Sequence, residues 1–248
     1  MDETSPAVLL IADISGFTRF MRLHALTTSH ARQIIVRLLK ALVEASGPPL
    51  KVAELEGDAV FFYALSTEDD LLKDTAAVKE QILRFFRTFK QEIEALQQVT
   101  ACVCEACANV GELRLKQVVH YGEVAVEKID RFEKLFGLDV IVVHRMLKNT
   151  VPSNEYLMMS DPAYAACTDF YDLEPERRTE EFEGVGAVET LVFYDTSLAS
   201  ALEQAPIDPP PTLNKNIGWK LKMHGRTMLE LVGLRKKADP GSIFPGVP

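Results

Sequence analysis

Long apolar runs are missing from this sequence of 248 residues. The apolar run Ala7–Ala12 stops at Asp13, so it is too short for a membrane-spanning helix or the core of a signal peptide. The first six residues also lack the basic side chains that open a signal peptide. We therefore expect a cytoplasmic protein without a transmembrane segment.

Positive charge is in short supply as well. The sequence has 27 Lys and Arg against 36 Asp and Glu, which gives a formal net charge of −9. Binding to a polyanion depends on neutralising phosphates with Lys and Arg. Nucleic acid is therefore not an expected partner.

Cysteine is also scarce, and three of the four cysteines form one cluster, Cys102, Cys104 and Cys107. A small secreted domain would spread an even number of cysteines along its chain. Reduced thiols are thus the simplest expectation. Three thiolates at this spacing could also bind Zn²⁺, but a structural zinc site normally has four ligands and the sequence shows no fourth. Both interpretations stay open.

Hydrophobic periodicity predicts an α+β sandwich with a mixed or antiparallel sheet covered by helices, the two long ones on one face. The expected strands cover 7–14, 50–65 (a hairpin around 56–58), 113–119 and 123–126 (a hairpin turned at 120–122), 156–159 and 190–194. The expected helices cover 18–45, with a break near 27–29, then 68–98, 140–149 and 162–166.

The C-terminal part of the chain has a different composition. We assign residues 1–200 to one domain, 201–211 to a proline-rich linker and 212–248 to a basic tail. The tail has a net charge of about +5 and the rest about −14. Trp219–Met223 alternates apolar and basic residues, which suits either a tail packed on the domain or a peripheral membrane contact.

Two aspartates are placed where phosphate chemistry would need them. Asp13 ends a predicted buried strand before a glycine-containing turn into a helix, and Asp58 follows 45 residues later at a predicted hairpin tip. Mg²⁺ is usually held by one or two carboxylates together with water and substrate phosphates, and a helix N-terminus favours phosphate. Alone, the Asp-Ile-Ser-Gly segment could also be a simple turn and helix cap.

Five short motifs follow one another along the chain. They are Ile11–Thr18 (IADISGFT), Glu56–Val60 (EGDAV) and Val119–Glu123 (VHYGE), followed by Phe136–Val140 leading to Arg145, and Gly184–Thr190. In order and spacing they resemble the motifs of the class III nucleotide cyclases. The resemblance covers about residues 7–195. It implies a ferredoxin-like βαββαβ core and conversion of a nucleoside triphosphate to a 3′,5′-cyclic nucleotide and pyrophosphate.

The resemblance also implies roles for individual residues. Asp13 and Asp58, with the backbone carbonyl of Ile14, would bind two Mg²⁺ or Mn²⁺ ions, and Arg145 would stabilise charge on the α-phosphate. Glu54 and Lys134 occupy the positions that read the base. The remaining nucleotide-contacting positions are Ser15, Gly16, Phe17, Thr18 and Gly57.

Some positions depart from the family pattern. Ile141 replaces the transition-state asparagine and Glu183 replaces a phosphate-binding lysine, so we expect a slow enzyme. By the resemblance, Glu54 is typical of guanylate cyclases but Lys134 is not, and these two opposite charges can also pair with each other, so the base cannot be named. The residues Lys116, His120, His144 and Lys148 are candidate substitutes for the lost groups.

Three functional hypotheses remain from the sequence. The first is a homodimeric cyclase whose two sites form between subunits, with Asp13 and Asp58 of one chain facing Arg145 of the other. The second is a nucleotide-binding or regulatory module that has lost turnover. The third is a metal-dependent phosphohydrolase that uses water as the nucleophile.

Overall fold

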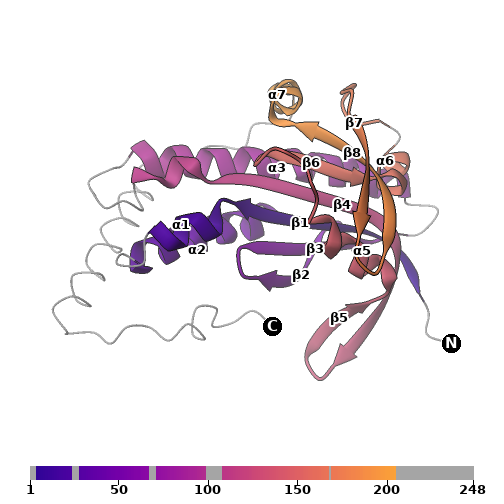
Figure 1. The fold of residues 1–248 in the computed structure, drawn as a ribbon. Coiled ribbons are helices and arrows are strands. Elements are labelled where there is room, and N and C mark those ends of the chain that lie inside the picture. The colour runs from indigo at the N-terminus through magenta and orange to yellow at the C-terminus, as the bar shows by residue number, and fades with distance from the viewer. Residues whose placement is uncertain (1–3, 24–27, 67–70, 99–107, 168, 205–248) are drawn as a thin grey trace.

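The computed structural model describes residues 4–23, 28–66, 71–98, 108–167 and 169–204 (Figure 1). Its strands are β1 (Ser5–Ser15), β2 (Lys51–Glu56), β3 (Ala59–Leu65), β4 (Arg114–Ile129), β5 (Phe132–Phe136), β6 (Tyr156–Ser160), β7 (Glu176–Phe182) and β8 (Gly186–Tyr194). Its helices are α1 (Phe17–Leu23), α2 (Thr28–Ala45), α3 (Leu71–Gln98), α5 (Leu138–Met146), α6 (Asp161–Cys167) and α7 (Asp195–Gln204), with a short 3₁₀ helix at Val110–Glu112.

These strands form one mixed sheet. Its order is β2-β3-β1-β4-β6-β8-β7, and β5 pairs with β4 away from this path. Strands β4 and β6 run parallel, whereas the other neighbours run antiparallel. The mixed sheet and its covering helices confirm the predicted α+β architecture.

Strand β1 lies inside the sheet because its sequence is almost entirely aliphatic. Residues Leu9–Ala12 have no exposed surface, and β1 pairs with β3 on one side and β4 on the other. Alternate side chains of a strand point to opposite faces, so β1 contributes to two cores. This arrangement fixes the position of Asp13, near the end of the strand.

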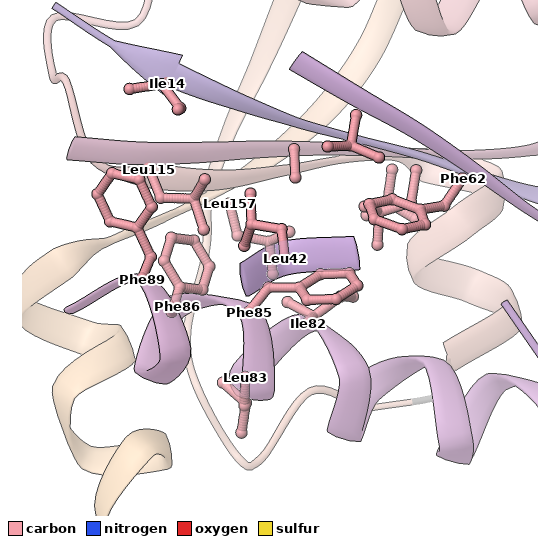
Figure 2. Close-up of a cluster of buried hydrophobic side chains, with 14 of the residues drawn as sticks. Ile14, Leu42, Phe62, Ile82, Leu83, Phe85, Phe86, Phe89, Leu115 and Leu157 are labelled. Atoms are coloured by element: carbon pink, nitrogen blue, oxygen red, sulfur yellow. The ribbon is translucent and has the colours of Figure 1, made fainter. Parts of the chain in front are cut away.

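The larger core lies between the sheet and the two long helices, α2 and α3, as predicted (Figure 1). Figure 2 shows Phe85, Phe86 and Phe89 of α3 in this core, and the Phe85 ring stacks on Phe62 of β3 with centroids 4.8 Å apart. Helix α5 covers the opposite face and buries Val143 there. Burial of each large apolar side chain contributes about 2–3 kcal/mol.

Strand β4 corrects the prediction of a hairpin turned at His120–Gly122. Residues 114–129 form one continuous strand, and the ladder with β1 runs through 120–122. Gly122 has another role, since an added Cβ would collide with the carboxylate of Asp139 on α5. The absence of a side chain there lets Asp139 accept a hydrogen bond from the Glu123 N–H at 2.7 Å.

The sequence did not predict two of the strands, β5 and β7. The real hairpin joins β4 to β5, with Asp130 at its tip in a left-handed conformation (φ 57°). Strand β7 is rich in charged residues, so it has no apolar alternation to detect. Helix α7 continues past residue 200, the predicted end of the domain.

Other predictions lie outside the described residues. These are the cysteine cluster at 102–107 and the segment from 205 onward, which includes most of the linker and all of the tail. Among the described helices, none is both long and apolar enough to cross a membrane.

Candidate active site

The structure brings Asp13 and Asp58 together where the C-terminal end of β1 lies beside the start of β3. Asp13 is paired with Ala59, the first residue of β3, and the N–H of Ile14 donates to the carbonyl oxygen of Asp58 at 3.2 Å. Gly57 forms the β2–β3 turn with a positive φ of 63°, a conformation that glycine adopts without strain. The turn therefore holds Asp58 against the end of β1.

Lys116 of β4 completes this cluster. It lies directly opposite Asp13 in the β1–β4 ladder, and its Nζ is 3.0 Å from Oδ2 of Asp13. Both side chains are largely shielded, at 20% and 15% exposure. Sequence reasoning named Lys116 as a possible substitute for a lost phosphate ligand but did not identify it as the partner of Asp13, because the register of β4 against β1 was unknown.

The electrostatics of the cluster are unfavourable for Asp58. Burial, and next the charge of Asp13, raise the pKa of Asp58 to about 6, against smaller opposing effects of a backbone hydrogen bond and Lys116. Burial alone would lower the pKa of Lys116, but the charge and hydrogen bond of Asp13 raise it overall. A bound cation would stabilise the ionised form of Asp58, so this carboxylate pair suits a divalent cation.

The protein supplies few metal ligands beyond these two carboxylates. Within the described ranges, no group of three or more His, Cys, Asp and Glu side chains is arranged to hold a metal ion. Mg²⁺ commonly keeps several waters and takes the rest of its ligands from one or two carboxylates and substrate phosphates. The residues present fit a cation that is shared with a phosphate substrate.

A buried tyrosine extends the polar row across the next strand. Tyr156 of β6 lies beside Lys116 in the parallel β4–β6 pair, is 2% exposed, and exchanges hydrogen bonds with the Asn149 side chain at 2.8 and 3.1 Å. Burial raises the pKa of Tyr156. The sequence predicted Tyr156 as a strand residue but did not indicate its place at this site, because an aromatic residue is common in any strand.

The two positions that the resemblance assigns to base reading, Glu54 and Lys134, pair with each other. Nζ of Lys134 donates to Oε2 of Glu54 at 2.5 Å, and this pair links β5 to β2. Both side chains are about half exposed, at 52% and 45%. The adjacent Glu133 accepts a hydrogen bond from the Tyr63 hydroxyl at 3.1 Å, so two contacts hold the hairpin arm against the sheet.

Arg145 lies on α5 beside a shallow hollow. The hollow has a volume of about 330 Å³ and is lined by Val140, Ile141, His144, Arg145 and Lys148. Nη1 of Arg145 is 4.0 Å from Oε2 of Glu183, which is 93% exposed. Ile141 is 51% exposed at the position of the expected asparagine.

The two predicted histidine substitutes make structural contacts. His144 faces the Val140 carbonyl at 2.7 Å and Glu56 at 2.9 Å, so it links α5 to the last residue of β2. His120 lies between Ser160 and Asp139, at 2.8 Å from each. His120 is four residues from Lys116 along β4, about 13 Å away, so it is remote from the aspartates.

The predicted phosphate-binding turn follows Asp13 directly. Gly16 has a positive φ of 86°, and its carbonyl accepts the first bond of α1 from the Phe20 N–H at 2.9 Å. Ser15 is buried, whereas Gly16 and Thr18 are exposed. The turn thus lies at the site, and its contact with phosphate stays a prediction.

The fold is that of nucleotide cyclase domains. The structure is similar to the adenylyl cyclase CyaB from P. aeruginosa (TM-score 0.57, 14% identity, 77% of this chain and 95% of that chain). It is also similar to the guanylyl cyclase Cya2 (TM-score 0.56, 18% identity, 77% and 92%). A class III adenylyl cyclase-like ATP-binding protein from Pseudomonas aeruginosa matches with a TM-score of 0.51 and 21% identity, over 66% of this chain and 35% of that one.

Sequence comparison relates the chain to one family model over part of its length and to a mycobacterial protein over most of its length. Residues 35–156 match a family described as protein of unknown function (DUF2652). The uncharacterized protein Rv2561/Rv2562 of Mycobacterium tuberculosis is 37% identical over 184 residues, which cover 72% of this chain and 77% of that protein. The chain belongs to the same family as this mycobacterial protein.

Proposed function

We propose that the protein is a divergent, metal-dependent nucleotide cyclase that converts a nucleoside triphosphate to a 3′,5′-cyclic nucleotide and pyrophosphate. The observation that carries this proposal is the meeting of Asp13 and Asp58, at a strand end and a hairpin tip, within a cyclase fold. A bound cation would offset the burial and the charge of Asp13 that together raise the pKa of Asp58.

In this mechanism the chain positions the substrate and compensates its charge. Asp13 and Asp58 would hold Mg²⁺ or Mn²⁺ together with the backbone oxygen of Ile14. Such cations lower the pKa of a bound hydroxyl, here the ribose 3′-hydroxyl, and neutralise a departing pyrophosphate. The Ser15–Thr18 turn and Gly57 would line the phosphates, while Glu54 and Lys134 would face the base.

The site must rearrange to accept a triphosphate, because its positively charged side chains already form ion pairs with carboxylates of the protein. Lys134–Glu54 and Arg145–Glu183 are solvent-exposed pairs, and breaking each costs about 0–1 kcal/mol. Lys116–Asp13 is shielded and is therefore harder to separate. Nucleotide binding should replace the first two pairs readily.

Arg145 would act across a homodimer. Its ion-pair partner in the described structure is Glu183 rather than either aspartate, so it can serve a site on a second copy. Loss of one such donor typically costs about 3 kcal/mol, or ~100-fold in rate. Ile141 cannot donate a hydrogen bond, so turnover should be slower than in a site with asparagine there.

A nucleotide-binding module without turnover is the second candidate. The apolar Ile141 and the pairing of Arg145 with Glu183 favour it, because both weaken charge stabilisation in the transition state. The similar Pseudomonas protein described as an ATP-binding, cyclase-like protein offers a precedent for such a role. We also propose that the working domain, which extends at least to the end of α7 at Gln204, lies in the cytoplasm and is joined by a linker to the basic tail.

The experiment is incubation of the purified full chain with each of ATP, GTP, CTP and UTP plus Mn²⁺, followed by mass spectrometry. A cyclic product that disappears in Asp58→Ala and persists in the surface variant Glu44→Ala supports the cyclase. Nucleotide-dependent thermal stabilisation without product supports the binding module, and a linear di- or monophosphate supports a phosphohydrolase. Absence of all three outcomes overturns the proposal.

A further inference from the structure

Three Lys or Arg side chains of the proposed function form ion pairs in this structure, and one pair differs from the other two. Lys134–Glu54 and Arg145–Glu183 lie at exposed positions, with one or both side chains about half exposed or more. Lys116–Asp13 is held inside the sheet by direct cross-strand pairing and is only 20% and 15% exposed. The Lys116 ammonium group therefore has a fixed position next to a predicted metal ligand.

The net negative charge of this cluster neutralises only part of the charge on one divalent cation. Two carboxylates and one ammonium leave a net charge of about −1. Two metal ions in a shared site would lie about 3.5–4 Å apart, so one of them would have to approach the ammonium group closely.

The arrangement of atoms around Asp13 also disfavours a second cation. Mg²⁺ lies about 2.0–2.1 Å from its oxygen ligands, and Oδ2 of Asp13 already accepts a contact from Lys116 Nζ at 3.0 Å. A cation on the other lone pair of that oxygen would lie close to the ammonium group and be repelled by it. The remaining carboxylate oxygens of Asp13 and Asp58 are sufficient for one shared cation with water ligands.

We propose that Lys116 takes the place of one of the two cations in the nucleotide-free protein, so that the resting site binds a single divalent ion. This inference rests on the proposed function and specifies how that site is loaded. The second cation would then enter only with a triphosphate, whose negative charge offers the ammonium group a new partner. Lys116 is in this sense a positioning residue that makes metal loading depend on nucleotide.

The test is a Mn²⁺ titration of the nucleotide-free full chain, with free Mn²⁺ measured by electron paramagnetic resonance. The wild-type chain should bind about one Mn²⁺ and Lys116→Met about two, because methionine keeps the length of the side chain and removes its charge. Lys40→Met is the matched control, since Lys40 forms an exposed pair with Glu44 on α2, and it should bind as wild type does.

The outcomes separate this inference from the proposed function. Two Mn²⁺ ions in the wild-type chain, or one in a folded Lys116→Met variant, would overturn the role of Lys116 and leave the metal site intact. No Mn²⁺ bound by the wild-type chain would overturn the metal site itself. Circular dichroism establishes that the variant is folded, and Lys116→Gln provides a polar alternative if the methionine variant is not.

Discussion

Asp58→Asn should make the metal-free protein more stable, although it removes a predicted metal ligand. Burial and the charge of Asp13 raise the pKa of Asp58 from 3.8 to about 6. An acid with a higher pKa in the folded state binds its proton more tightly when the chain is folded. Stability is therefore lost as the pH rises from about 4 through about 6, and the full penalty remains above that range.

The size of the effect follows from the shift. About two pKa units correspond to ~3 kcal/mol at most, and the partial exposure of Asp58 reduces this to about 1–2 kcal/mol through solvent screening. Asparagine has nearly the same size and keeps an acceptor oxygen. The free energy of unfolding should thus rise by that amount at pH 8 and by close to zero at pH 4.

The assay is urea or thermal denaturation in EDTA at both pH values. The melting temperature should rise by a few degrees at pH 8, since ~1 kcal/mol shifts it by about 2–4 °C in a domain of this size. Asp13→Asn is the comparison, and it should lower stability by about 1–3 kcal/mol because Lys116 loses its partner. A loss of stability in Asp58→Asn at pH 8, or an equal gain at both pH values, would refute the reasoning.

Three further outcomes are expected. Phe62→Ala should lose about 3–5 kcal/mol in urea denaturation, because the ring is buried against Phe85, whereas the half-exposed Phe132 should tolerate alanine with a loss below ~1 kcal/mol. Gly122→Ala should cost about 1–3 kcal/mol by thermal denaturation, because the new methyl group displaces Asp139. Arg145→Ala should lower cyclic product formation by ~100-fold and leave the Mn²⁺ stoichiometry unchanged.

Much of the fold could be predicted because local patterns agree with the final structure. The aliphatic run ending at Asp13 and the apolar period of α3 each lead to one interpretation. The prediction of a turn at 120–122 was wrong, because a His-Tyr-Gly sequence is typical of a turn but lies within the continuous strand β4 here. Only the long-range approach of Asp139 explains that glycine, and no local pattern contains this information.

The site could be predicted in part for the same reason. Asp13 and Asp58 could be paired because each lies close to the end of a strand with a clear sequence signal and has a glycine nearby. The contacts of Lys116 and Tyr156 depend on strand register across β1, β4 and β6, which the sequence does not determine. The pairing of Arg145 with Glu183 likewise depends on how the β7–β8 turn meets α5.

The most direct measurement of the central claim is an anomalous diffraction map of crystals grown with Mn²⁺ and a non-hydrolysable nucleoside triphosphate analogue. The account predicts a manganese peak about 2 Å from carboxylate oxygens of both Asp13 and Asp58, with the phosphates beside it. Bound analogue with no manganese between these two side chains would contradict the account.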